Sequence, residues 1–306
     1  MQRISDGDRM ERADIAVVVV NYNAGNRLYE CARSVLAEPD VSELWVVDNA
    51  SRDGSLQRLE TEYRNDERLR VVRNDRNLGF AAANNIALRQ TSAPFILLLN
   101  PDCVLRGGTI AAVRAALEAR PDAGMAGCLI VNPDGSEQRG GRRHLPDLRS
   151  SFVRVLHLER WRGGRMRGFD LAGTPLPEET VEVEAISGAF MLVRRAAVED
   201  VGLLDEGYFL HCEDLDWCIR FAQKGWRILF VPRVSVLHRQ GTSSRTRPVR
   251  VLWYKHRGMW RFHRKHYAAQ TPSALNALVW VGIWLRFALL AVPATVTGLM
   301  RSRYER

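Results

Sequence analysis

The stretch Phe95-Ile-Leu-Leu-Leu-Asn100-Pro101-Asp102 decides the fold. Its apolar run predicts a buried strand, which ends at Pro101 because proline cannot donate to a central ladder. The strand therefore carries Asp102 to the C-terminal edge of a sheet, where open α/β folds bind their ligands. A carboxylate there can hold a hard divalent cation, and the cation can hold a diphosphate. The alternative is that Asp102 is a solvated turn residue without a ligand. Taken by itself, this stretch favours that alternative.

Strands and helices alternate four times in the first hundred residues. This pattern, with short strands that lack a polar face, predicts an α/β fold with a central, mostly parallel sheet and helices on both faces. We expect strands at 15–20, 44–47, 69–73, 95–99, 123–131, 183–194, 227–231 and 234–238, and helices at 26–36, 55–63, 79–90, 108–120 and 213–225. We expect residues 139–180 to be irregular, exposed and directed towards a substrate.

Composition sets outer limits on function. The chain has 306 residues and a net charge of +9, which implies an anionic partner such as nucleic acid, a phosphorylated substrate or an anionic membrane. Its five cysteines are odd in number and form no CxxC pair. They indicate a reducing compartment and argue against a disulfide framework or a structural zinc site. Residues 1–14 are polar and charged, so we expect no signal peptide.

The C-terminal tail concentrates the positive charge. Between Arg245 and Lys265 there are eight Arg or Lys residues and no Asp or Glu, and 249–267 has the pattern of a basic, aromatic helix. Residues 276–300 are strongly apolar but contain Arg286. A spanning helix needs about 20 apolar residues, and a central arginine costs roughly 2.5–3.5 kcal/mol. We therefore expect an interfacial helix or helical hairpin on an anionic membrane surface, rather than a buried C-terminal helix.

These patterns predict a division of the chain and a location. Residues 1–245 form the α/β domain, and residues 246–306 form a helical, membrane-associated tail in which 249–300 contacts the anionic surface. The protein is then cytoplasmic and peripheral on the inner face of the cell membrane. Nucleic acid is not the expected partner.

Two further motifs reach the ligand-binding edge of the predicted sheet. Asp48 ends the second strand, and a carboxylate there can accept the N3–H of uracil or thymine; capping of the turn at 51–54 is the alternative. Asn77-Leu-Gly79-Phe-Ala-Ala-Ala-Asn84 opens the third helix, where backbone N–H groups and amides can grip a sugar or phosphate. A helix that merely starts at a glycine is the alternative.

The run Glu213-Asp214-Leu-Asp216 opens a helix, where simple capping favours acidic residues. On a helical wheel Asp214 falls inside the apolar arc, whereas Asp216 falls on the polar face and is spaced to pair with Arg220. Partial burial is expected to raise the pKa of Asp214 and to make it a better general base. His238 ends an apolar strand before a polar loop at 240–245, which suits a second metal or diphosphate ligand, although a core histidine is the plainer alternative.

Taken together, these motifs resemble the family-two inverting glycosyltransferases of the GT-A fold, and most of all the bacterial rhamnosyltransferase-like branch. The resemblance covers roughly residues 15–245, and the motifs follow one another in order. They are Val-Val-Asn21-Tyr-Asn23, Val-Asp48-Asn-Ala-Ser-x-Asp53-Gly-Ser, Asn77-x-Gly79-Phe-Ala-x-Ala-Asn84, Leu-Asn100-Pro-Asp102, Ser187-Gly188-Ala-Phe-Met-Leu-Val-Arg-Arg195, Gly202-Leu-Leu-Asp205-Glu-x-Tyr-Phe, Glu213-Asp214-x-Asp216 and His238-x-x-Gly241.

The resemblance implies roles for particular residues. Asp214 is the catalytic base, with Glu213 as its neighbour and alternative. Asp102 is the main ligand of Mg²⁺ or Mn²⁺, and His238 assists at the metal or diphosphate. Many relatives carry two carboxylates at this metal, whereas this chain has Asn100 before Pro101 and Asp102, so metal affinity without the donor is expected to be low. The residues expected to bind the nucleotide and donor are Asn21, Asn23, Asp48, Asn77, Gly79, Asn84, Asn100, Asp102 and Gly188.

The activity implied is inverting transfer of a sugar, with rhamnose suggested by the branch, from a UDP- or dTDP-sugar. The acceptor is a hydroxyl of a polyprenyl-diphosphate-linked or cell-surface glycan, as in bacterial cell-envelope polysaccharide biosynthesis. The alternatives are a nucleotide-sugar-binding protein without turnover, a nucleotidylyltransferase and a basic nucleic-acid-binding protein. A dinucleotide dehydrogenase is disfavoured because no G-x-G-x-x-G follows the first strand.

Overall fold

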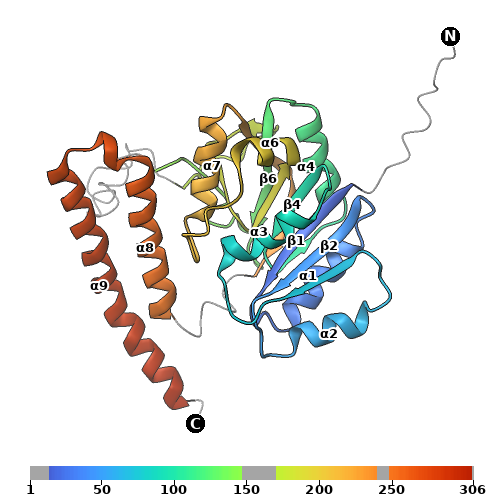
Figure 1. Cartoon of the computed structure of the whole chain (residues 1–306), viewed down its shortest axis with the longest axis horizontal. Helices are drawn as coiled ribbons and strands as arrows, with labels where there is room; N and C mark the ends of the chain where they lie inside the picture. The colour runs from blue at the N-terminus through green and yellow to red at the C-terminus, as the bar shows by residue number, and fades with distance from the viewer. Residues whose placement is uncertain (1–13, 147–169, 240–247, 305–306) are drawn as a thin grey trace.

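The computed structural model of the protein describes residues 14–146, 170–239 and 248–304 (Figure 1). The polar loop 240–245 and more than half of the stretch 139–180 lie outside the described residues.

One nine-stranded sheet forms the centre of the catalytic region, in the order β3-β2-β1-β4-β10-β6-β11-β5, with β8 beside β11. β1 to β4 run parallel to one another, and β10 is antiparallel to both of its neighbours. The predicted mostly parallel sheet is thus confirmed. The strands are β1 Ile15–Asn21, β2 Val41–Asp48, β3 Leu69–Arg73, β4 Phe95–Leu99, β5 Cys103–Leu105, β6 Ala123–Val131, β8 Val181–Glu182, β10 Phe190–Arg194 and β11 Arg227–His238. A separate two-stranded sheet joins β7 Arg142–Arg143 to β9 Ala185–Ile186.

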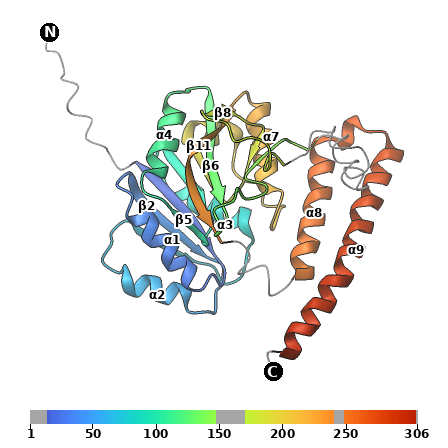
Figure 2. The ribbon, with the colours of Figure 1, turned by 180° about the vertical axis from the view of Figure 1, so that it is seen from behind.

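Helices cover both faces of the sheet because its central strands are apolar on both sides (Figures 1 and 2). In β1, Val17 and Val19 enter one core and Val18 and Val20 enter the other, as the period of two along a strand requires. The first core is closed by α1 Asn26–Leu36, α2 Ser55–Glu62 and α4 Thr109–Glu118, and the second by α3 Phe80–Gln90, α6 Arg195–Val201 and α7 Glu213–Gln223.

Two expectations for the second half of the chain were wrong in detail, and one helix was not expected. Residues 183–194 do not form one strand, because the turn at 187–189 separates β9 from β10. The two strands expected at 227–231 and 234–238 are one strand, β11, which continues past Pro232 with a shift of register. Helix α6 follows β10 directly, although its sequence carries no capping signal that stands out.

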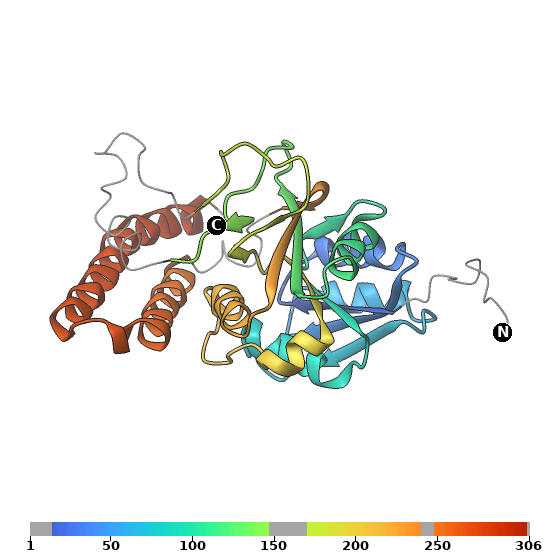
Figure 3. The same ribbon diagram turned by 90° about the horizontal axis from the view of Figure 1, so that it is seen from above.

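The C-terminal tail is a helical hairpin. Helix α8 (Pro248–His266) is followed by a short 3₁₀ turn (Ala268–Gln270) and by α9 (Ser273–Tyr304), which lies alongside α8 (Figures 1 and 3). Within α9, Ser273–Val292 is long and apolar enough to cross a membrane. Its exposed side chains include Leu278, Val281, Leu285 and Leu289.

Helix α8 is also bound to the catalytic region. Asp216 of α7 is fully buried, and it contacts Lys265 at 2.8 Å and His266 at 2.8 Å, in addition to the predicted partner Arg220 at 2.9 Å. The expected pairing of Asp216 with Arg220 is confirmed, and the side chain is buried because α8 covers this polar face of α7. The division of the chain at residue 245 stays a prediction. Helix α8, which follows this boundary, contacts α7 of the first part as well as α9.

Candidate functional site

The carboxyl ends of β1 and β2 border a cavity of about 400 Å³. Tyr22 and Asn23 line it after β1, and the segment after β3 contributes a second wall. The remaining lining residues are Asn49, Ala50, Arg52, Asp75, Arg76 and Asn77. Parallel strands that end together leave such a crevice at the sheet edge, which is the usual ligand site of an open α/β sheet.

Asp48 lies buried beside this cavity rather than in its lining. Its carboxylate accepts hydrogen bonds from Asn21 Nδ2 at 2.7 Å and from the backbone N–H of Ser51 at 3.0 Å. The alternative role, capping of the turn at 51–54, is therefore present. A carboxylate has about four acceptor positions, so these two bonds leave capacity for a ligand. Asn23 Oδ1 accepts from the backbone N–H of Arg52 at 2.8 Å, which holds the same turn.

The Asn77–Asn84 motif is held mainly by local bonds. Asn77 Oδ1 accepts from Gly79 N at 2.8 Å. Gly79 has φ +88° and lies so close to Phe209 that a Cβ would be 2.5 Å from its carbonyl oxygen. Asn84 donates to the Phe80 carbonyl at 2.9 Å, and its Oδ1 is buried without a hydrogen-bond partner among the described residues. Asn77 thus lines the cavity. Gly79 permits the close approach of the Phe209 backbone, and Asn84 Oδ1 can still accept a hydrogen bond.

The turn after β4 brings Asp102 against the end of β11. Asp102 Oδ1 lies 3.1 Å from His238 Nε2, and Asn100 Nδ2 lies 3.3 Å from the same nitrogen. Arg27 of α1 approaches the other carboxylate oxygen at 3.8 Å. The predicted pair of Asp102 and His238 is therefore adjacent, although 136 residues separate the two in the chain.

Gln138 fixes the tautomer of His238. Its Nε2 donates to the backbone carbonyl of His238 at 3.2 Å, so its Oε1 is the atom that faces His238 Nδ1 at 2.6 Å. Because Oε1 can only accept, Nδ1 carries the proton, and Nε2 faces the Asp102 carboxylate. In the neutral imidazole Nε2 carries a lone pair, so Nε2 and Asp102 Oδ1, which lie 3.1 Å apart, can both serve one cation.

The donor atoms fit a hard or borderline divalent cation. A carboxylate and an imidazole suit Mn²⁺, and Mg²⁺ accepts the carboxylate. Cys103 also lies within 4.8 Å of these atoms, but its buried thiol donates to the Ala189 carbonyl. Burial raises the pKa of this thiol well above its usual value, which argues against a thiolate ligand.

Asp214 is held by an ion pair at the start of α7. Arg143 Nη2 lies 2.5 Å from Asp214 Oδ2 and 2.6 Å from the Ile186 carbonyl, and Gly188 N donates to Asp214 at 3.3 Å. Burial would raise the pKa of Asp214, but the charge and hydrogen bond of Arg143 hold it below its usual value. The expected rise was therefore wrong. The helical wheel showed the apolar arc around Asp214, but it could not show that Arg143 of β7 contacts this carboxylate.

Glu213 is the carboxyl group whose pKa rises. Burial, and then the adjacent charge of Asp214, raises the pKa of Glu213 to about 8. Its Oε2 is buried without a hydrogen-bond partner among the described residues. At neutral pH the pair therefore consists of an ionised Asp214 and a protonated Glu213.

The turn at 187–189 connects the two halves of the site. Gly188 N binds Asp214, and the next carbonyl, that of Ala189, accepts from Asn100 N at 3.0 Å. Asp102 and Asp214 thus lie at the same edge of the sheet, on opposite sides of this turn. Gly188 contributes its backbone N–H to Asp214, and a Cβ there would make an ordinary van der Waals contact, 3.5 Å from Asp214 Cβ.

The sequence did not single out Arg143, Gln138 or Asp75. Arg143 belongs to the Arg- and Gly-rich stretch that was expected to be irregular, and its partner lies 71 residues away. Gln138 lies 100 residues from His238, and Asp75 is one of many exposed turn aspartates. No local pattern separates these residues from their neighbours.

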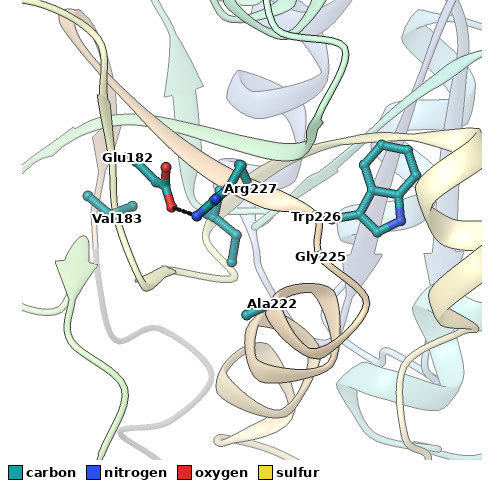
Figure 4. Close-up of a pocket in the computed structure, with 7 residues that line it drawn as sticks. Glu182, Val183, Ala222, Gly225, Trp226 and Arg227 are labelled. Carbon is teal, nitrogen blue, oxygen red and sulfur yellow. Dashed lines mark hydrogen bonds and ion pairs between the residues drawn. The ribbon is translucent and has the colours of Figure 1, made fainter.

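A smaller pocket of about 210 Å³ lies at the opposite edge of the sheet (Figure 4). It is lined by Trp226 and by the Glu182–Arg227 ion pair, whose atoms are 2.8 Å apart. Arg227 begins β11 and His238 ends it, so this pocket is separated from the site by the length of the strand.

Comparisons with known proteins agree with this geometry. Glycosyl transferase family 2 matches residues 16–202. The N-acetylglucosaminyl-diphospho-decaprenol L-rhamnosyltransferase of Mycobacterium tuberculosis is 30% identical over 266 residues, which cover 81% of this chain and 83% of that protein. Rhamnosyltransferase WbbL of Escherichia coli is 28% identical over 52% of this chain and 60% of its own.

Solved structures share the fold. The mannosyltransferase PcManGT of Pyrobaculum calidifontis, in complex with GDP-Man and Mn²⁺, covers 96% of this chain and 76% of its own, with a TM-score of 0.56 and 18% identity. S. aureus TarS with UDP-GlcNAc covers 89% of this chain and 71% of its own, with a TM-score of 0.56 and 17% identity. The chain therefore belongs to glycosyl transferase family 2, and it is a nucleotide-sugar-dependent glycosyltransferase with the GT-A fold.

Proposed function

We propose that this enzyme transfers a hexosyl group, with L-rhamnose as the first candidate, from a uridine or thymidine diphosphate sugar to a polyprenyl-diphosphate-linked acceptor. The configuration at the anomeric carbon inverts. The relative from Mycobacterium tuberculosis, whose name specifies such an acceptor and such a sugar, supports the substrate class. The observation that carries the chemistry is the placement of Asp102 and Asp214 on either side of the turn at 187–189.

The nucleotide occupies the cavity between Tyr22 and Asn77. Asp48 accepts the N3–H of the pyrimidine, or Asp75 does so from the lining of the cavity. Asn21 and Asn23 hold the loop after β1, while Asn77, Gly79 and Asn84 shape the approach of the sugar. In this arrangement the diphosphate extends towards Asn100 and Asp102.

Asp102 and His238 would hold Mg²⁺ or Mn²⁺, with Gln138 keeping the ligating nitrogen of His238 free of its proton. A bound divalent cation neutralises negative charge on a leaving diphosphate. Asn100 Nδ2 lies 3.3 Å from His238 Nε2 and would give up this contact when that nitrogen binds the metal. Such a site has a single carboxylate, so its affinity for metal is expected to depend on the donor's own phosphates.

Asp214 is the general base. It takes the proton from the acceptor hydroxyl as that oxygen forms its bond to the anomeric carbon, and the bond from this carbon to the diphosphate breaks on the opposite face. Arg143 keeps Asp214 ionised and oriented, whereas the protonated Glu213 cannot serve as the base at neutral pH. One protein carboxylate suffices, unlike the pair on which glycosidases rely.

The hairpin of α8 and α9 places the enzyme on the inner face of the cell membrane, as a peripheral protein. Support comes from the exposed apolar side chains of α9 and from the cations of α8. An apolar face combined with positive charge favours anionic leaflets. A lipid-linked acceptor would then be presented at the same surface.

The experiment is a transfer assay with UDP- and dTDP-sugars, including dTDP-rhamnose, and with a polyprenyl-diphosphate-linked N-acetylglucosamine. We expect Mn²⁺-dependent product from one donor, and a loss of at least about 10²-fold in kcat with Asp214→Asn. Asp122→Asn, at an exposed Arg120 pair, is the control variant that should behave like wild type. Binding of donor without turnover would instead favour a sensor, and full activity of Asp214→Asn would refute its role as base.

A further inference from the structure

We propose that Lys255 of α8 and Arg286 of α9 bind the diphosphate of the lipid-linked acceptor beside the catalytic carboxylates. This inference rests on the proposed function, and it assigns a phosphate subsite to the hairpin that otherwise serves as a membrane contact. It also gives a role to the arginine that interrupts the apolar sequence of α9.

One turn of α8 lies directly against the residues that precede the base. Gly258 is buried so closely that a Cβ would lie 2.9 Å from the His211 carbonyl oxygen and 3.4 Å from Cys212 Sγ. Glu213 and Asp214 follow immediately at the start of α7. Lys255, one turn earlier on α8, is exposed. Burial, and then the positive charge of Lys255, lowers the pKa of His211 to about 4, which agrees with a position of that charge near the start of α7.

Arg286 lies beside the same turn of α8. His256 Nδ1 donates to the Leu252 carbonyl at 2.7 Å, so its Nε2 is the acceptor that faces Arg286 Nη1 at 3.2 Å. Because His256 directly follows Lys255, the Arg286–His256 contact places the Arg286 guanidinium beside the helical turn of α8 that carries Lys255. An arginine inside an apolar helix of this length is costly in hydrocarbon, and such residues commonly mark a ligand position.

The charge around these two residues favours an anion. Helices α8 and α9 contain no Asp or Glu. Of the carboxylates that face α8, Asp205 binds Arg261 at 2.8 Å and Asp216 binds Lys265 at 2.8 Å, both further along the helix. Asp214 is matched by Arg143 at 2.5 Å. The hairpin thus presents positive charge beside the place where the acceptor hydroxyl must meet its base.

The lipid side of the acceptor has a matching surface. Leu278, Val281, Leu285 and Leu289 recur every three or four residues, so they form one exposed stripe along α9. Arg286 lies next to Leu285 in this helix. A polyprenyl chain along the apolar surface would leave its diphosphate at Arg286 and Lys255 and its sugar near Asp214.

The test measures kcat and KM for two acceptors that carry the same sugar, one on a polyprenyl diphosphate and one on a simple alkyl group. Lys255→Met keeps the length of the side chain and removes its charge. We expect KM for the diphosphate-linked acceptor to rise about tenfold, as for the loss of one hydrogen bond to a charged group. The expected kcat is unchanged, the alkyl glycoside shows no effect, and Lys255→Arg restores the low KM. Arg286→Lys, which retains the charge at a shorter reach, should raise the same KM more weakly.

Arg264→Met is the matched control. Arg264 is an exposed cation of the same helix, nine residues from Lys255 and therefore on the opposite face. It should leave the KM for both acceptors unchanged. Equal effects of Lys255→Met and Arg264→Met would mean that only total charge matters, and this would overturn the proposal.

Three further outcomes would overturn it. An unchanged KM in Lys255→Met would exclude a phosphate contact, and a rise in the KM of the donor alone would assign Lys255 to the other diphosphate. Weaker binding to phosphatidylglycerol vesicles, with equal loss for both acceptors, would assign it to lipid headgroups. If the wild-type enzyme does not glycosylate the diphosphate-linked acceptor at all, the proposed function itself fails, and this result differs from all the others.

Discussion

Removing the carboxylate of Asp216 tests whether α8 supports the catalytic helix. This side chain is fully buried, and it holds Arg220 of its own helix together with Lys265 and His266 of α8. In Asp216→Ala, the partner charges lose their counterion, and two of them stay mostly shielded from water: the Arg220 side chain is 17% exposed and the His266 side chain 4%. Breaking a buried pair by removing one partner is strongly destabilising because an uncompensated charge remains.

The structure sets the size of this effect. A fully buried pair costs about 3–5 kcal/mol when one partner is removed. The Lys265 side chain is 34% exposed and regains water, so we expect the lower end, about 3 kcal/mol in the free energy of unfolding. For a chain of this size each kcal/mol corresponds to about 2 °C, which predicts a fall of roughly 6 °C in Tm.

Thermal unfolding of the full chain, followed by circular dichroism, measures this difference. Asp122→Ala is the control, since Asp122 and Arg120 form an ion pair with both side chains about half exposed, at 52% and 47%. Exposed ion pairs contribute little to stability, so the Tm of this variant should stay close to that of wild type. Equal Tm values for the two variants would refute the claim that α8 is anchored through Asp216.

The same network predicts a dependence on pH. Burial alone would raise the pKa of Asp216, but hydrogen bonds from His266 and Lys265 hold it below its usual value of 3.8. A carboxyl group with a lower pKa in the folded state stabilises the fold above its unfolded pKa, and this contribution is lost as pH falls below it. The difference in Tm between wild type and Asp216→Ala should therefore be full at neutral pH and shrink below about pH 3.8.

Two further variants test the site. Gln138→Leu removes the acceptor of the His238 Nδ1 proton, so the Mn²⁺ concentration that gives half-maximal transfer should rise about 10–100-fold. An unchanged dependence on Mn²⁺ would contradict the proposed tautomer. Arg143→Met leaves Asp214 buried without its cation, so the pKa of Asp214 should rise and the acidic limb of kcat/KM against pH should move to higher pH. Arg139→Met is the control, since the Arg139 side chain is 84% exposed. If the pH profiles of Arg143→Met and Arg139→Met coincide, Asp214 is not the base.

Much of the fold could be predicted from local sequence patterns. The β-branched and apolar runs at 15–20 and 95–99 became β1 and β4, because strands buried on both faces need no polar side. Helix α7 ends as Gly225 predicts, with φ +86° just beyond its last turn. By contrast, the break between β9 and β10 depends on the turn at 187–189. Ser187 closes this turn locally, and contacts with Asp214 and Asn100 tie it to distant parts of the chain.

The site divides in the same way. Asp48, Asp102 and His238 could be assigned to one edge of the sheet. Asp48 and His238 are the last residues of their strands, and Asp102 lies in the turn that follows β4. The pKa of Asp214 could not be predicted, because its apolar neighbours lie on its own helix whereas Arg143 arrives from β7. A helical wheel shows which side of a helix a residue occupies, but not what another element places there.

The sequence by itself determined the alternation of strands and helices, the carboxylates at the strand ends and the basic, apolar tail. Each of these follows from residue periodicity over a few turns or strands. Only the tertiary structure decided which carboxylate is ionised, which nitrogen of His238 faces Asp102, and that α8 covers Asp216. These properties depend on desolvation and on hydrogen-bond partners more than 40 residues away, and such long-range contacts leave no periodic mark on the chain.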